Sequence, residues 1–128
     1  MRLLLDTHAF MWWLAGNRRL SPAARRAVDD SSNDVVVSAA TAWEITTKHR
    51  VGKLPEAEAV ARDVTASIAS QGFEELEITV KDAERAGRLP GAHRDPFDRM
   101  LIAQALTHNL TVVSIDSVFD RYGVSRLW

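Results

Sequence analysis

Three consecutive leucines run directly into an aspartate near the N-terminus, at residues 3–6. Such an apolar run, bounded by a polar residue, is typical of a central strand in a parallel sheet, because helices cover both faces of that strand. Asp6 then lies at the carboxyl end of the strand. In open parallel α/β sheets, ligands bind outside these carboxyl ends. We therefore expect Asp6 to lie where the chemistry takes place.

The rest of the chain alternates between short β-branched runs and helical stretches. We expect strands at residues 2–6, 34–38, 73–78, 111–114 and 125–127, with 73–78 at an edge of the sheet. We expect helices at residues 9–15, 22–30, 39–51, 56–70, 80–88, 96–107 and 117–121. This alternation predicts an α/β fold with a parallel sheet. The 128 residues contain no repeat or linker, so we expect a single domain over residues 1–128.

Four acidic residues each follow the carboxyl end of a strand or open a helix. Asp6 ends the first strand, and Glu44 lies just inside the helix after the second strand. Asp98 lies in the first turn of the helix that opens at Pro96, and Asp116 follows the fourth strand by two residues. In a doubly wound sheet such positions converge on one edge, so the sequence predicts a cluster of carboxylates there.

Each of these acids also has a purely structural interpretation. Asp6 and Asp116 can cap the helices that follow them. Glu44 can close a capping box with Thr41, and Asp98 lies where the helix dipole favours an acid. If every acid only caps a helix, the chain is a protein-binding module without catalysis.

The electrostatics of a cluster favour a bound cation. Two carboxylates about 5 Å apart repel each other by roughly 3 kcal/mol at an effective dielectric near 20. A helix dipole returns only about 0.3–1 kcal/mol. The acids must therefore take up protons or share a cation, and an all-oxygen cluster suits Mg²⁺ or Mn²⁺. Such an ion can activate water and neutralise charge on a phosphodiester.

The composition narrows the other possibilities. The chain has no cysteine, so it has no disulfide, no thiolate zinc site and no cysteine nucleophile. It has no apolar run of the length that spans a bilayer and no signal-peptide pattern, so we expect a cytoplasmic protein without a membrane partner. The four histidines show no pair at metal-ligand spacing, and we expect them to be structural or at the surface.

A formal net charge of −1 excludes nucleic-acid binding through overall positive charge. Any contact with RNA must come from local cations or a metal. Lys48 lies four residues after Glu44, and Arg94 and Arg99 flank the acidic turn before Asp98. These three side chains are the candidates for contacts with a phosphate backbone.

The chain resembles PIN-domain ribonucleases of the VapC toxin type. The matching stretches are residues 3–8 (LLLDTH), 38–45 (SAATAWEI), 52–54 (GKL), 93–105 (HRDPFDRMLIAQA) and 113–116 (VSID). They span the chain in the family's order, and the ordered set is more specific than any single stretch. The resemblance implies a three-layer α/β/α sandwich, a Mg²⁺- or Mn²⁺-dependent endoribonuclease, an antitoxin partner and a homodimer.

The resemblance also implies roles for individual residues. Asp6, Glu44 and Asp98 match the core metal ligands, and Asp116 matches the fourth acid. Thr7 could add a hydroxyl to the site. Asp95 is left as a helix cap or as a group that supports a ligand.

Phosphatases of the haloacid dehalogenase type also end a first strand with an acid. That family needs a second acid two residues later, and this chain has His8 at that position. The sequence therefore argues against this alternative.

Overall fold

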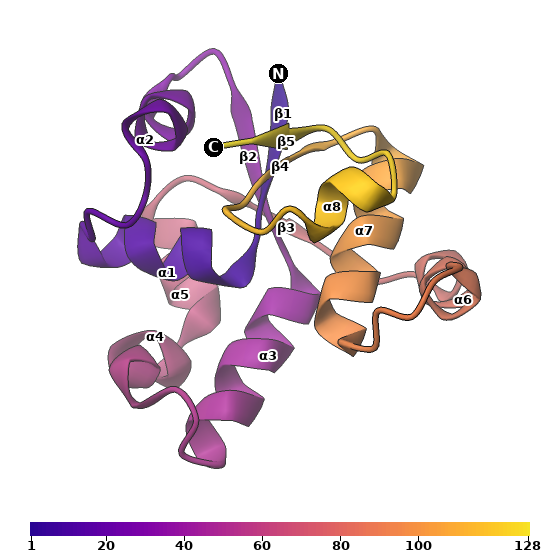
Figure 1. Ribbon diagram of the computed structural model, residues 1–128. Helices are drawn as coiled ribbons and strands as arrows, with labels where there is room; N and C mark the ends of the chain where they lie inside the picture. Colours follow the sequence, from indigo (N-terminus) through magenta and orange to yellow (C-terminus); the bar gives the residue numbers. More distant parts are fainter.

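The computed structural model describes all residues, 1–128, and is built on a five-stranded sheet with the strand order β3-β2-β1-β4-β5 (Figure 1). All four neighbouring pairs are parallel. The strands are β1 (Arg2–Leu5), β2 (Asp34–Ser38), β3 (Glu74–Leu76), β4 (Thr111–Val113) and β5 (Arg126–Leu127). The leucine run thus forms the central strand, and β3 lies at an edge, as predicted.

Alternate residues of the strands face two separate cores, as the pleat of a strand requires. Leu3 and Leu5 belong to one apolar cluster, and Leu4 belongs to the other. The first cluster is completed by α1 (Thr7–Ala15), α2 (Pro22–Asp29) and α5 (Val64–Ser70). The second is completed by α7 (Pro96–His108) and α8 (Val118–Arg121). This is the predicted three-layer α/β/α architecture.

Two helices extend beyond these layers (Figure 1). α3 (Ala39–Arg50) leaves the carboxyl end of β2 and contributes Ala40 to one core and Ile45 to the other. α6 (Val80–Arg88) packs on α7. None of the helices is both long and apolar enough to cross a membrane.

Several predicted boundaries were wrong by a residue or more, among them that of β3, which covers Glu74–Leu76 and not 73–78. β1 ends at Leu5 and α1 begins at Thr7, because Asp6 leaves the strand to become the helix cap. The predicted helix at 56–70 is divided into a 3₁₀ turn (Pro55–Ala57), α4 (Glu58–Arg62) and α5. The break is at Asp63, whose backbone is not helical and whose carboxylate accepts the Ala66 N–H at 2.9 Å.

Candidate active site

Asp6 lies at the carboxyl end of the central strand, where its carboxylate is buried and accepts few hydrogen bonds. It is 9% exposed, and its Oδ1 accepts the Ala9 N–H at 2.8 Å as the cap of α1. Burial raises the pKa of Asp6 to about 6, and the charge of Asp98 adds to the rise. The Ser114 hydroxyl, the Ala9 N–H and His8 only partly oppose it. An anion held this way is stabilised by any cation that reaches it.

Glu44 projects from α3 toward the N-terminal turn of α1 and is 6% exposed. Its Oε1 accepts the Thr7 hydroxyl at 2.5 Å, and its Oε2 is paired with the Lys48 ammonium one turn later. Glu44 therefore does not close the capping box with Thr41 that the sequence allowed, and its carboxylate faces other side chains instead of its own helix end.

Asp98 lies in the first turn of α7 and contacts a side chain from the preceding loop. His93 Nε2 lies 2.9 Å from Asp98 Oδ2. Burial raises the pKa of Asp98, the charges of Asp95 and Glu44 raise it further, and His93 opposes the rise. Asp95 itself caps α7, because its Oδ1 accepts the N–H groups of Phe97 at 2.9 Å and Asp98 at 3.0 Å.

Asp6, Glu44 and Asp98 thus share one electrostatic neighbourhood, although they come from three different elements. Asp98 raises the pKa of Asp6, and Glu44 raises that of Asp98. No group of three acidic or histidine side chains is arranged to hold one metal ion, however. Lys48 is paired with one carboxylate oxygen of Glu44, and His93 contacts one carboxylate oxygen of Asp98. The three residues fit a hard divalent cation, because all of them offer carboxylate oxygens. Two of these carboxyl groups, those of Asp6 and Asp98, have raised pKa values.

Asp116 differs from these three acids in its exposure. Its side chain is exposed, and its Oδ1 accepts the N–H of Val118, the first residue of α8, at 2.9 Å. Its own N–H donates to the Ser114 hydroxyl at 3.0 Å, and this hydroxyl also lowers the pKa of Asp6. The structural interpretation therefore fits Asp95, part of the role of Asp6, the local bond of Asp116 to Val118, and the place of Asp98 in the first turn of α7. It does not fit Glu44.

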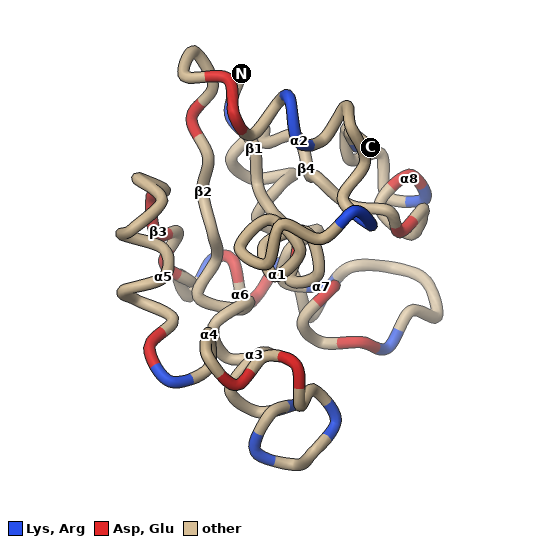
Figure 2. The backbone as a smooth tube through the Cα atoms, turned by 90° about the vertical axis from the view of Figure 1, so that its left-hand side faces the viewer, with Lys and Arg blue, Asp and Glu red and all other residues tan.

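The three cations that the sequence proposed for RNA contact differ in their surroundings. Figure 2 shows Lys and Arg positions at the end of α3 and in the loop before α7, beside Asp and Glu positions. Lys48 lies next to the acids, and Arg94 is exposed in that loop. Arg99 instead donates to four backbone carbonyls, so its guanidinium is occupied within the fold. The structure argues against Arg99 as an RNA contact.

Sequence reasoning assigned no role at the site to His93 or to the pair Trp43 and Phe97. The ring of Trp43, which is 58% exposed, meets Phe97 edge-on at 4.8 Å between centroids. Lys48 Nζ lies 5.8 Å from the Phe97 ring centre. The sequence did contain a signal for these residues, because each of them lies inside one of the stretches that match the family.

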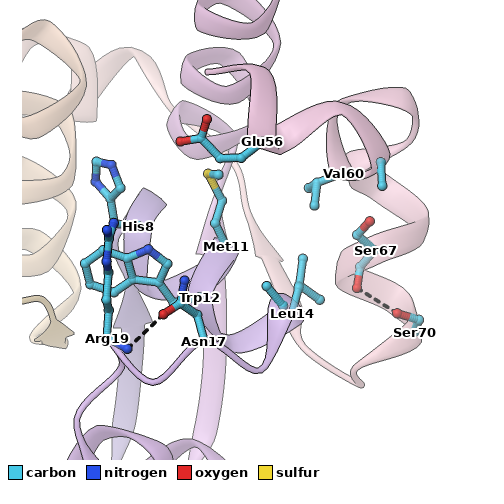
Figure 3. Close-up of a pocket in the computed structure, with 12 residues that line it drawn as sticks. His8, Met11, Trp12, Leu14, Asn17, Arg19, Glu56, Val60, Ser67 and Ser70 are labelled. Carbon is cyan, nitrogen blue, oxygen red and sulfur yellow. Dashed lines mark hydrogen bonds between the residues drawn. The ribbon is translucent and has the colours of Figure 1, made fainter. Parts of the chain in front are cut away.

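Two hollows share His8 in their lining, and the smaller of them is also lined by Glu44. A cavity of about 210 Å³ is lined by Thr7, Glu44, Lys48, Lys53 and Leu54 as well as His8. A larger groove of about 460 Å³ runs between α1 and the α4–α5 segment (Figure 3). Met11, Leu14 and Val60 give its wall an apolar surface, and Arg19 and Glu56 lie at its edge.

Comparisons with known proteins agree with this geometry. The PIN domain family model matches residues 3–125. Ribonuclease VapC22 of Mycobacterium tuberculosis (strain ATCC 25618 / H37Rv) is 31% identical over 119 residues, covering 89% of this chain and 86% of the relative.

Solved structures share the fold at lower identity. VapBC2 from Rickettsia felis, bound to a DNA fragment from its promoter, aligns with a TM-score of 0.71 and 16% identity over 98% of this chain and 97% of that one. The Sarcin-Ricin loop cleaving toxin VapC20 of Mycobacterium tuberculosis aligns with a TM-score of 0.68 and 19% identity over 95% of each chain.

Proposed function

Because the chain belongs to the PIN domain family, we propose that it is a divalent-metal-dependent endoribonuclease, the toxin of a toxin–antitoxin pair. The observation that carries this proposal is the buried, donor-poor carboxylate of Asp6, whose pKa of about 6 is raised by burial and by Asp98. Perturbed carboxylates at the carboxyl edge of a parallel sheet are typical of a catalytic site.

Asp6, Glu44 and Asp98 would hold Mg²⁺ or Mn²⁺, and Asp116 would act from outside through water. A bound ion of this kind lowers the pKa of a coordinated water and neutralises charge on the phosphodiester. Thr7 orients Glu44 through its hydroxyl, and Asp95 keeps Asp98 in place by capping the first turn of α7.

Lys48 and Arg94 would guide RNA by its phosphates. Lys48 lies in the cavity beside Glu44. Burial lowers its pKa, but Glu44, Asp95 and Asp98 together raise it above its usual value, so the ammonium stays charged. Phosphate contacts of this kind position a strand without reading its sequence. Because RNA is the substrate, we place the protein in the cytoplasm, and we keep the homodimer as a proposal from the family.

We place the antitoxin in the groove of Figure 3, because its apolar wall leads to His8 and the cavity beside Glu44. A segment lying there would cover the entrance to the site. Val60→Asp puts a charge on this wall and is expected to abolish co-purification with the antitoxin while RNA cleavage by the free chain is retained. Val80→Asp, at a position 79% exposed on α6, is the matched control. Unchanged capture by the Val60 variant would contradict the placement.

The test of the proposed activity is Asp6→Asn. Asparagine caps helices as well as aspartate does, so the hydrogen bond to the Ala9 N–H is retained and only the charge is removed. We expect cleavage of single-stranded RNA with Mg²⁺ to collapse while the circular dichroism spectrum is unchanged. The exposed Asp29→Asn is the control and should cleave normally. Full activity of Asp6→Asn would rule the mechanism out.

A further inference from the structure

The loop at residues 89–95 delivers a side chain to the candidate site. It connects the end of α6 to Asp95, the cap of α7, and has no helix or strand of its own. His93 lies in this loop and places its Nε2 2.9 Å from Asp98 Oδ2. Whatever fixes the path of the loop therefore fixes the surroundings of Asp98.

Arg99 binds both ends of this path. Its Nε donates to the Ala86 carbonyl at 3.1 Å, and its Nη2 donates to the Leu89 carbonyl at 2.5 Å and more weakly to Gly87 at 3.5 Å. Its Nη1 donates to the carbonyl of His93 at 3.0 Å. The last carbonyls of a helix have no partner within the helix, and a cation there also interacts favourably with the helix dipole.

These contacts need the shape of a guanidinium as well as its charge. Arginine presents five donors in a rigid planar fork, whereas lysine has one compact ammonium on a flexible stem. A lysine at this position can reach one carbonyl group or the other, but it cannot hold the end of α6 and His93 at the same time.

We propose that Arg99 is a positioning residue, which ties residues 89–95 to α7 and thereby holds His93 against Asp98. A second anchor acts on the same loop, because the Tyr122 hydroxyl donates to the Pro90 carbonyl at 2.8 Å. The effect on RNA cleavage rests on the proposed function, whereas the effect on the loop does not.

Arg99→Lys tests the proposal with two independent measurements on the full chain. Hydrogen exchange at the Leu89 amide, which donates to the Arg85 carbonyl at 3.0 Å where the loop leaves α6, is expected to become roughly tenfold faster or more, because local opening no longer has to break the Arg99 contacts. In RNA cleavage, kcat is expected to fall roughly tenfold or more, as small misplacements of a site do. KM is expected to stay near the wild-type value, because the positive charge is kept.

Arg85→Lys is the matched control. Arg85 also crosses from α6 to α7, where it donates to the Thr107 hydroxyl at 3.1 Å, but it does not contact the loop. Its substitution should leave loop exchange and kcat unchanged. A stability loss without a change in loop exchange or kcat, shared by the two lysine variants, would overturn the proposal.

The competing role of Arg99, a direct RNA contact, gives the opposite pattern. In that case Arg99→Lys keeps wild-type loop exchange and kcat, and only Arg99→Ala raises KM; this result would overturn the proposal. If the wild-type chain does not cleave RNA, the proposed function fails, and the exchange measurement alone decides on the role of Arg99.

Tyr122→Phe keeps the proposal testable if Arg99→Lys does not fold. It removes only the hydroxyl that holds Pro90. The expected result is a change in the same direction, with faster exchange at the Leu89 amide and a lower kcat, but smaller than for Arg99. In that case, unchanged exchange in the phenylalanine variant would overturn the proposal.

Discussion

Two buried carboxylates of this chain, Asp82 and Asp6, lie in opposite kinds of surroundings. Asp82 Oδ2 accepts the Thr79 N–H at 3.1 Å and the Gln104 amide at 3.2 Å, and its Oδ1 lies 3.5 Å from His108 Nε2. Burial raises the pKa of Asp82, but these partners outweigh burial and hold the pKa below its usual range. For Asp6 burial prevails, and the pKa rises to about 6.

The difference separates a structural acid from a functional one. The fold supplies two donors to Asp82 Oδ2 and places His108 near Oδ1, which accepts no hydrogen bond. Through Gln104 the same network reaches the Ser38 hydroxyl that caps α3. Asp6 and Asp98 face each other's charge and have fewer donors, so their ionised forms gain most from a cation that is not part of the chain. Burial alone would not have distinguished the two cases.

The largest expected effect is on RNA cleavage by Asp98→Asn. We expect a loss of at least about a hundredfold, the usual scale for removing an electrostatic group of a catalytic site. Stability should be retained or increased, because burial and neighbouring acids raise the pKa of this carboxyl group. Initial cleavage rates and urea unfolding at neutral pH check both parts. Asp29→Asn is the control. A strong loss of stability with normal cleavage in Asp98→Asn would show that Asp98 is a structural acid and not a functional one.

Asp82→Asn is expected to give the opposite result. It weakens the bonds to Thr79 and Gln104 and leaves His108 without its partner, which should cost about 2 kcal/mol of unfolding free energy. Cleavage per folded molecule should be close to that of the wild type. Urea unfolding and rates normalised to folded protein measure the two quantities. Unchanged stability would contradict the structural role of Asp82.

The stability difference between the wild type and Asp82→Asn should depend on pH. A carboxyl group whose pKa is lower in the folded state stabilises the fold above its unfolded pKa of about 3.9. This contribution is lost as the pH falls through the folded-state value. Urea unfolding at a series of pH values should therefore show a gap that is full near neutral pH and shrinks in acid. A stability difference that grows as the pH falls would contradict the lowered pKa of Asp82 in the folded state.

Asp116→Asn should have the smallest effect. Asparagine can still accept the Val118 N–H at the start of α8, and the side chain of Asp116 is exposed, unlike those of Asp6 and Glu44. We expect a loss of cleavage of up to about tenfold, clearly less than for Asp98→Asn. Parallel rate measurements on the two variants make the comparison. An equal loss would place Asp116 among the core acids.

Much of the fold follows from local patterns in the sequence. The leucine run predicts the central strand because only a strand covered on both faces buries every side chain. Thr79 predicts the start of α6 because its hydroxyl accepts the Asp82 N–H in a capping box. The convergence of Asp6, Glu44 and Asp98 follows from the parallel topology, since the carboxyl ends of neighbouring strands share an edge.

Other features depend on partners distant in the chain, which local patterns do not encode. Asp82 and Asp6 both lie at ordinary capping positions, and only the approach of Gln104 and His108 from α7 sets Asp82 apart. Arg99 looked like a free cation because the carbonyl groups it binds belong to another helix and a loop. The break at Asp63 was also missed, since helix-forming residues surround it.

The most direct test of this account is a titration with Mn²⁺ followed by the unfolding temperature. A ligand that binds only the folded state raises this temperature in a saturable way. We predict such a rise for the wild type and for Asp82→Asn, and its loss in Asp98→Asn. If the wild type shows no rise, or if Asp98→Asn responds as the wild type does, Asp6, Glu44 and Asp98 are not a metal site.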